Sequence, residues 1–315
     1  MTHETTTAIA PEDTDYTVWW DAALRVARVS GEPCTTTAER FVGGVPPATF
    51  PRLYGGQLAG QSVSAAAATV EPAREVHSVQ VSYLRSGDPG VPVDYTVERL
   101  RDSRTLSTRG VRAEQGGRLL ATATVSFHDV ASAGTGTALR HDRTGRPTVA
   151  AEGLPSRAER LAERFGDAVP AVAAPRWPVD TRYVDRAPWD PIGPATSREP
   201  RNRMWLRPHG QLPDVAAVHA AAVTFATDFP MFEPVLFPHD IDWALLTTGR
   251  TVYGASLDHV LWFHRPPRFD DWLLLDQVSP VADRSRGFCH AELRSVGGEL
   301  VATVAQEIAF VSPRG

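Results

Sequence analysis

An internal repeat constrains the fold of this 315-residue chain more than any other feature of its sequence. Residues 101–122 (RDSRTLSTRGVRAEQGGRLLAT) align at a constant offset with residues 282–303 (ADRSRGFCHAELRSVGGELVAT). The matching positions are Asp102 with Asp283, Gly116–Gly117 with Gly297–Gly298, Leu119 with Leu300, and Ala121–Thr122 with Ala302–Thr303. A glycine pair between two alternating runs is typical of a β-hairpin turn, so each copy predicts a hairpin.

The sequence before each hairpin repeats as well. Strand-like segments lie at 76–85 (VHSVQVSYLR) and 256–265 (SLDHVLWFHR), and both end in an aromatic residue, one further residue and an arginine. Alanine-rich apolar segments precede them at 55–70 and 213–227. Because these segments are apolar on nearly every side, they predict buried helices, the second with an N-cap region at its Pro-Asp start.

Each repeat therefore predicts a strand, a buried helix, and then three or four long antiparallel strands. We place the first unit at residues 17–130 and the second at 176–312, joined by a linker at 131–175 that is long enough to cross between them. The linker contains one amphipathic helix candidate at 155–166. The Trp19–Trp20 pair is expected in an opening helix that packs on the sheet, or at a subunit contact.

Composition and charge exclude several classes of protein. The net charge is −5 and the chain has no cluster of basic residues, so no nucleic-acid partner is expected. The two cysteines, Cys34 and Cys289, are too few for a disulfide framework or a zinc site and favour a reducing compartment. The polar, acidic start is not typical of a signal peptide, and no run of about 18 apolar residues predicts a membrane span. We expect a cytoplasmic protein that acts away from membranes.

An ordered set of short motifs across both units resembles the acyl-CoA thioesterase II family. This resemblance implies an α+β fold of the tandem (double) hotdog type, in which an antiparallel sheet wraps around a central helix in each unit. No resemblance extends to the first 15 residues or to the linker. The motifs are YGGQLAGQ (54–61), VHSVQVSYLRSGDP (76–89), VERLRDSRTLSTR (97–109), ATDFP (226–230), SLDHVLWFHRP (256–266), DDWLL (270–274), SRGF (285–288) and LVATVAQE (300–307).

The resemblance also implies a catalytic set. In that family an Asp at the end of the second helix, a Thr on the following strand and a Gln on the last strand hold the hydrolytic water. These positions fall on Asp228, Ser256 and Gln306. Serine in place of threonine keeps the hydroxyl group but loses the methyl group that helps to fix the side-chain rotamer.

Thioester hydrolysis requires what these residues offer. A carboxylate at the end of a buried helix loses solvation, so the pKa of Asp228 should rise toward the range of a useful base. A hydroxyl and an amide can satisfy the other hydrogen bonds of a water molecule. The oxyanion needs preorganised N–H donors, and Gly55, Gly56 and Gln57 offer them at a helix N-terminus. The cleft would then lie between the two units.

Simpler interpretations of the same residues stay open at this stage. Asp228 can be a solvated residue at a helix end that Pro230 terminates, and Gln306 an outward-facing strand residue. Ser256 can be an ordinary strand serine. The glycines at 55 and 56 can be a tight turn into a packed helix.

Other arrangements of reactive residues are disfavoured. The chain has no G-x-S-x-G motif, which argues against an α/β-hydrolase. On a strand Ser256 and Asp258 share a face and His259 points away, so we expect no triad. Cys289 and His290 are adjacent and should also point in opposite directions. His239, Asp240 and Asp242 in FPHDID (237–242) are expected in a surface loop.

Three functions remain. The first is hydrolysis of acyl-CoA to free acid and CoA without a metal or redox cofactor. The second is the same chemistry on acyl groups carried by an acyl carrier protein in a biosynthetic pathway. The third is a non-catalytic acyl-binding double hotdog, which the intact Asp/hydroxyl/Gln set disfavours. The resemblance further implies a homodimer of tandem units.

Overall fold

The computed structural model describes residues 14–30, 38–48, 50–132, 141, 149–166, 177–191, 193–194, 196–239 and 253–311. The first unit contains α1 (Tyr16–Leu24), β1 (Val26–Arg28), β2 (Ala38–Gly43), α2 (Gly55–Ala67), β3 (Glu75–Tyr83), β4 (Asp94–Asp102), β5 (Leu106–Gln115) and β6 (Arg118–His128). The second contains β7 (Val179–Tyr183), β8 (Arg201–Pro208), α4 (Ala216–Asp228), η4 (Phe229–Phe232), α5 (Glu233–Leu236), η5 (Phe237–His239), β9 (Tyr253–Ser256), β10 (Asp258–Phe263), β11 (Leu273–Asp283), β12 (Arg286–Ser295) and β13 (Leu300–Val311). Between them lie η2 (Ala151–Gly153) and α3 (Arg157–Phe165).

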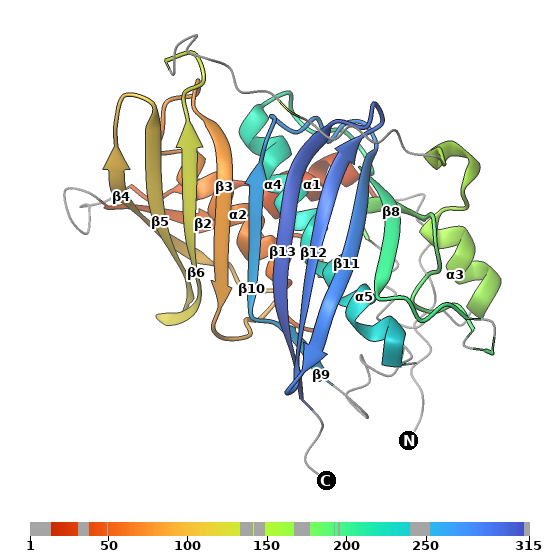
Figure 1. Ribbon diagram of the computed structural model, residues 1–315. Coiled ribbons are helices and arrows are strands. Elements are labelled where there is room, and N and C mark those ends of the chain that lie inside the picture. The colour runs from red at the N-terminus through yellow and green to blue at the C-terminus, as the bar shows by residue number, and fades with distance from the viewer. Residues whose placement is uncertain are drawn as a thin grey trace.

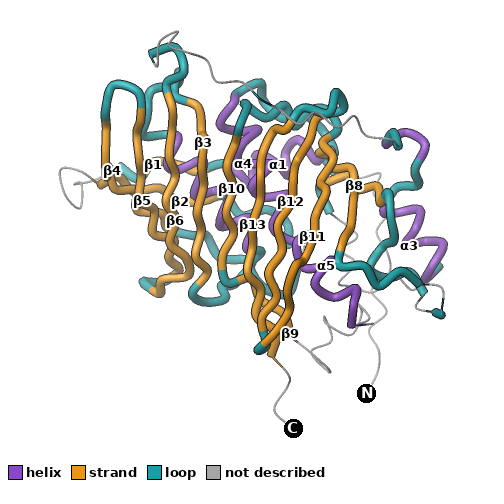
Figure 2. The backbone as a smooth tube through the Cα atoms, viewed as in Figure 1, coloured by secondary structure: helices purple, strands orange, loops and turns teal. Residues whose placement is uncertain are grey.

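The described strands form one antiparallel sheet that runs through both units (Figures 1 and 2). Its order is β1-β2-β4-β5-β6-β3-β10-β13-β12-β11-β8-β7, and β9 pairs with β13 beside this path. The two units join edge to edge where β3 pairs with β10 over Asp258↔Ser82 to Trp262↔Ser78. Helices α1, α2 and α4 lie together behind this sheet in Figure 1. The predicted double hotdog, with one continuous sheet, is confirmed.

The two central helices are buried against each other as well as against the sheet. Ten residues of α2 and ten of α4 are buried, as the apolar sequences of both segments predicted. A Cβ at Gly56 would lie 2.4 Å from the Phe225 carbonyl oxygen, and one at Gly60 would lie 3.0 Å from that of Ala221. Glycine at these two positions lets the helices approach closely, and the pairing shows that they run antiparallel.

The opening helix α1 covers the contact between α2 and α4. Trp19 and Trp20 are buried, and the rings of both pack edge-on against Phe225 at centroid distances of 5.5 and 5.2 Å. The Trp20 indole N–H donates to the His209 carbonyl at 3.0 Å. The predicted helix is confirmed, but its tryptophans pack against the central helix α4 of the other unit.

Local turn and cap predictions had mixed outcomes. Both hairpins form, and Gly116 and Gly117 adopt positive φ values of 54° and 75° in the first turn. The predicted N-cap region of the second helix is wrong in detail. The N-cap residue of α4 is Val215, whose apolar side chain cannot accept a hydrogen bond, and the Asp214 carboxylate pairs with Arg268 instead.

Residues 149–166, in the segment predicted as a linker, pack against the second unit. The predicted helix at 155–166 is confirmed as α3, and Ser156 and Glu159 form its N-terminal capping box. The Trp205 indole N–H donates to the Val149 carbonyl at 3.0 Å. Arg182 donates to the carbonyl groups of Ala151 and Leu154.

We predict that Gly56→Ala destabilises the protein by about 1–3 kcal/mol, the usual cost of overpacking. The new methyl group would meet the Phe225 carbonyl, which is backbone and cannot move aside without separating α2 from α4. Urea denaturation would measure the change. Gly90→Ala is the matched control, since no atom lies within 4 Å of a Cβ built there. Equal stability of the two variants would contradict the role assigned to the close helix contact.

Candidate active site

Asp228 is the last residue of α4, and only 2% of it is exposed. Burial raises the pKa of its carboxyl group from 3.8 to about 7. Hydrogen bonds from Ser256, the Gly56 backbone and Tyr83 oppose this increase but do not cancel it. A carboxyl group with a pKa near neutrality can accept and release a proton at physiological pH.

Ser256 and Gln306 reach Asp228 from two paired strands. Ser256 ends β9, and its Oγ donates to Asp228 Oδ1 at 3.3 Å. Gln306 on β13 donates through Nε2 to Ser256 Oγ at 3.0 Å and to the Asp228 backbone oxygen at 3.1 Å. The structure therefore brings the three residues together within hydrogen-bonding distance, while their chemical roles stay a prediction.

Tyr83 adds a contact from the first unit that sequence analysis did not single out. It is the last residue of β3, and its hydroxyl donates to Asp228 Oδ1 at 3.4 Å. Burial, reinforced by the charge of Asp228, raises the pKa of Tyr83 well above its usual value, so the hydroxyl keeps its proton. The sequence did hold a signal, because Tyr83 and Phe263 end the two repeated strand segments and only Tyr83 carries a hydroxyl group.

The N-terminus of α2 faces the same carboxylate. A Cβ at Gly55 would lie 2.8 Å from Asp228 Oδ2, and the Gly56 amide donates a hydrogen bond to the Asp228 carboxylate. The predicted oxyanion glycines thus lie next to the predicted base. Gln57, the third predicted donor, is directed differently: its side chain donates to the Gly44 carbonyl at 3.5 Å and its backbone N–H to Tyr54 at 3.1 Å.

Tyr54 ties the start of α2 to the end of α4. Its hydroxyl donates to the Phe225 carbonyl at 2.8 Å and accepts from the Phe229 N–H at 3.1 Å, so it satisfies backbone groups where α4 ends. The rings of Phe50 and Trp177 pack against Tyr54 at centroid distances of 5.2 and 5.7 Å. Aromatic rings therefore surround Tyr54, and Phe50, Tyr54 and Phe225 contribute to the lining of a small pocket.

The predicted orientation of His259 is wrong. The strand is interrupted at Leu257, between β9 and β10, so the alternation of side chains does not continue from Ser256 to His259. Both residues face α4 as a result. Asp258 lies apart from Ser256, and its carboxylate accepts from the Glu307 N–H at 2.7 Å. The three residues form no triad, as expected, but for this different reason.

His259 is buried directly behind the site. Its Nε2 lies 3.1 Å from Thr227 Oγ1, and Thr227 donates its own proton to the Val223 carbonyl at 2.9 Å. The histidine must therefore donate its Nε2 proton to Thr227. Burial lowers the pKa of His259 to about 4, so the ring is neutral near pH 7.

Among the described residues, none of the remaining candidates hydrogen-bonds to the Asp228 carboxylate. Cys289 is buried and His290 is exposed, on opposite faces of β12 as predicted. Burial raises the pKa of Cys289 above its usual value, which keeps the thiol protonated. His239 is exposed at the end of η5. Its predicted neighbours Asp240 and Asp242, like Cys34, lie outside the described residues.

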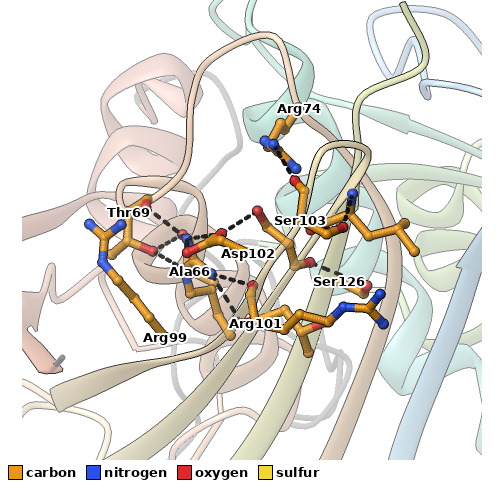
Figure 3. Close-up of polar contacts among 12 residues, drawn as sticks. Ala66, Thr69, Arg74, Arg99, Arg101, Asp102, Ser103 and Ser126 are labelled. Atoms are coloured by element: carbon orange, nitrogen blue, oxygen red, sulfur yellow. Dashed lines mark hydrogen bonds and ion pairs between the residues drawn. The ribbon is translucent and has the colours of Figure 1, made fainter. Parts of the chain in front are cut away.

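The first unit carries a different group at the counterpart of this site, and two of the residues that bind it, Asp102 and Thr69, are labelled in Figure 3. In the repeat, Gln306 corresponds to Val125. Val125 pairs with Arg109 and Gln306 pairs with Cys289, so Arg109 is the counterpart of Cys289. Arg109 is buried and donates to Asp102 Oδ1 at 2.9 Å and to Thr69 Oγ1 at 2.8 Å. The Arg109 guanidinium group therefore lies at the end of α2, whereas the corresponding end of α4 carries the Asp228 carboxylate.

Two kinds of feature are absent from the described residues. No group of three or more His, Cys, Asp or Glu residues there could hold a metal ion. Within the same ranges, the helices are too short or too polar for any of them to cross a membrane.

Family models match both units of the chain. A model described as the acyl-CoA thioesterase N-terminal domain matches residues 45–128, and one described as the acyl-CoA thioesterase C-terminal domain matches residues 147–310. Together they cover more than half of the sequence and follow the two halves of the sheet.

Individual relatives agree with these matches. The chain is 32% identical to human acyl-coenzyme A thioesterase 8 over 267 residues, covering 81% of this chain and 79% of that protein. It is 28% identical to acyl-CoA thioesterase 2 of Haemophilus influenzae over 266 residues, covering 82% and 87%. The crystal structure of the acyl-CoA thioesterase II TesB2 of Mycobacterium marinum superposes with a TM-score of 0.69 at 30% identity, covering 94% of this chain and 99% of that one.

The raised pKa of Asp228 predicts a pH-dependent effect of Asp228→Asn on stability. The folded protein holds this proton up to about pH 7, whereas the unfolded chain loses it near pH 4, so wild-type stability falls as pH rises between these values. Asn cannot ionise and avoids this loss. The variant should be the more stable above pH 7, by up to about 4 kcal/mol for three pKa units, and should lose that advantage toward pH 4.

Thermal unfolding of both proteins between pH 4 and 8 would measure this difference. Asp283→Asn is the control, because the Asp283 side chain is 75% exposed and its removal should not add a pH-dependent gain. A stability difference for Asp228→Asn that is the same at every pH would show that the carboxyl group titrates normally.

Proposed function

The chain belongs to the acyl-CoA thioesterase II family, and we propose that it hydrolyses acyl-CoA through a water molecule activated by Asp228. It is an acyl-CoA thioesterase, as the family models and the curated relatives agree. The observation that carries the proposed site is the hydrogen-bonded set of Asp228, Ser256 and Gln306 at a buried helix end.

Asp228 acts as the general base in this proposal. Water adds to the thioester carbonyl as its proton passes to the Asp228 carboxylate. The tetrahedral intermediate then expels the CoA thiolate, which receives the proton, and the products are the free acid and CoA. A pKa near 7 supports this role, since the group is partly ionised at neutral pH and still basic enough to accept a proton.

Ser256 and Gln306 position the base and its water. Gln306 donates one N–H to the Asp228 backbone oxygen and one to Ser256 Oγ, and Ser256 then donates to the carboxylate. Gln306 Oε1 accepts no hydrogen bond of standard geometry among the described residues, although the Gln306 side chain also interacts with the buried His259 ring. That oxygen can accept a hydrogen bond from the attacking water while the Asp228 carboxylate accepts the other proton.

The start of α2 supplies the oxyanion donors in this proposal. The N–H groups of a helix N-terminus favour negative charge, and glycine at position 55 lets the Asp228 carboxylate come close to the α2 backbone. The Gly56 N–H donates to the Asp228 carboxylate in this structure, so it becomes available to the oxyanion as that carboxylate takes up the proton of the water. Base and oxyanion donors thus come from different units, so hydrolysis needs both halves of the tandem.

We predict that Asp228→Asn lowers kcat by about 10²–10⁴-fold, the usual contribution of a general base. Asn keeps the size of the side chain but accepts no proton, and KM should change little because the loss falls on the chemical step. Thiol release from acyl-CoA, followed with a thiol-reactive dye, would measure both constants. An unchanged kcat would mean that the carboxylate only ends the helix.

Variants of Ser256 provide the matched control. Ser256→Thr keeps the hydroxyl group and should retain activity, whereas Ser256→Ala and Gln306→Ala should lower kcat because the water and the carboxylate lose orienting contacts. The loss at Ser256 should be the smaller of the two.

Tyr83→Phe should shift the pH dependence of the reaction. The Tyr83 hydroxyl stabilises the ionised carboxylate and so lowers the pKa of Asp228. Without it that pKa rises, and the acid limb of the kcat/KM profile should move to higher pH while activity well above the pKa is largely retained. Profiles from pH 5 to 9 would show this. Coincident acid limbs for wild type and variant would exclude Tyr83 from the site's electrostatics.

The carrier of the acyl group can be tested directly. Acyl-CoA is the favoured carrier because the curated relatives are named as acyl-CoA thioesterases. Thiol release measured in parallel on matched acyl-CoA and acyl-carrier-protein thioesters would compare the two. Faster release from the carrier protein would replace CoA in the proposal, and no release from either would favour an acyl-binding protein without activity.

A further inference from the structure

Polar side chains continue from the catalytic set across the inner face of the second unit's sheet. Gln306 on β13 pairs with Cys289 on the neighbouring strand β12. The next strand, β11, carries Gln277, which pairs with Asn202 on β8. All four residues are completely buried. Paired residues on neighbouring strands place their side chains on the same face, so Gln277 and Asn202 lie side by side.

The amide groups of Gln277 and Asn202 are incompletely bonded. Asn202 Nδ2 donates to Glu233 Oε2 at 2.6 Å, but Asn202 Oδ1 has no partner among the described residues. Gln277 has none there for either Oε1 or Nε2. Native proteins pair nearly all buried polar atoms, because an unpaired one destabilises the fold. Three such atoms on two adjacent residues therefore point to a ligand.

The fold itself does not require an amide at this position. In the first unit Val97 on β4 pairs with Val111, as Gln277 pairs with Ala291 in the second. Val97 is therefore the repeat counterpart of Gln277, and it is fully buried without any polar group. A valine at this point of the sheet packs well, so Gln277 serves something other than packing.

The unpaired atoms favour a neutral ligand group. They comprise two carbonyl oxygens, which accept hydrogen bonds, and one NH₂ group, which donates. A hydroxyl group both donates and accepts and matches this set. A carboxylate or phosphate would face two carbonyl oxygens, which cannot donate a hydrogen bond to it. The nearby Arg157 is already hydrogen-bonded to Tyr183 and attracted to Glu233.

We propose that Gln277 and Asn202 bind a hydroxyl group carried by the acyl chain far from the thioester. The substrates of the protein are then medium-chain acyl-CoAs that carry a hydroxyl group near the end of the acyl chain farthest from the thioester. Strands β13 and β11 are two strand spacings apart, about 10 Å, which a medium-length acyl chain can span between Asp228 and Gln277. The chain would lie between this face and α5, which packs against β8, β11 and β12. This inference rests on the proposed hydrolysis of acyl-CoA.

Matched substrates test the proposal. Hexanoyl-, octanoyl- and decanoyl-CoA would be compared with their ω-hydroxy analogues in the thiol-release assay. The hydroxylated member should have the higher kcat/KM for at least one chain length, by about tenfold for one or two well-formed hydrogen bonds. Equal or lower values for the hydroxylated member at every length would overturn the proposal.

Gln277→Val, which installs the residue of the first unit, separates ligand binding from a structural role. This variant should lose the preference for the ω-hydroxy substrate and keep or increase its activity on the unsubstituted one. Gln80→Val, the same exchange on an exposed position of β3, should leave the preference unchanged. If Gln277→Val changes the activity on both substrates equally, the amide only holds internal water, and the proposal fails.

Binding to the Asp228→Asn protein keeps this test independent of catalysis. Calorimetry would compare octanoyl-CoA with ω-hydroxyoctanoyl-CoA on that protein, with and without Gln277→Val. Absence of hydrolysis by the wild type would overturn the proposed function alone, provided that the binding preference is found. Absence of the preference with intact hydrolysis would overturn the hydroxyl site alone.

Discussion

The close contact between α2 and α4 is the constraint on which the rest of the site depends. Gly56 and Gly60 bring the α2 backbone against carbonyl oxygens of α4, and because the helices run antiparallel, the start of one meets the end of the other. This meeting point holds Asp228 beside Gly55 and lets Tyr54 cap the last turn of α4. The continuous sheet then fixes the distance between the units, so neither half can form the site alone.

The repeat is symmetric in its backbone and asymmetric in its buried polar groups. At matched positions of the inner face the first unit has Val125, Arg109 and Val97, where the second has Gln306, Cys289 and Gln277. In the first unit the Arg109 guanidinium neutralises Asp102 and satisfies Thr69 at the end of α2. In the second unit no cation of the described residues compensates the Asp228 carboxylate, which is a cost to stability and an advantage for proton transfer.

The surroundings of Asp228 balance these two effects. Removing the carboxyl group from water raises its pKa, while donors from both units keep it from rising further. Hydrogen bonds to the carboxylate also fix its orientation toward one reaction site. His259 and Thr227 add a neutral layer behind the site, where a charged imidazole would otherwise lower the basicity of the carboxylate.

The sequence determined the tandem architecture, because the same order of apolar helix, strand and hairpin occurs twice and can be recognised along the chain. Its resemblance to the acyl-CoA thioesterase II family also singled out Asp228, Ser256 and Gln306, and the structure places them in contact. Only the tertiary structure decided the rest. Tyr83, Tyr54 and Arg109 act through contacts with residues distant in sequence, and the interruption at Leu257 turned His259 inward against the expected alternation. Such contacts depend on how helices and strands pack in three dimensions, and local periodicity does not encode that packing.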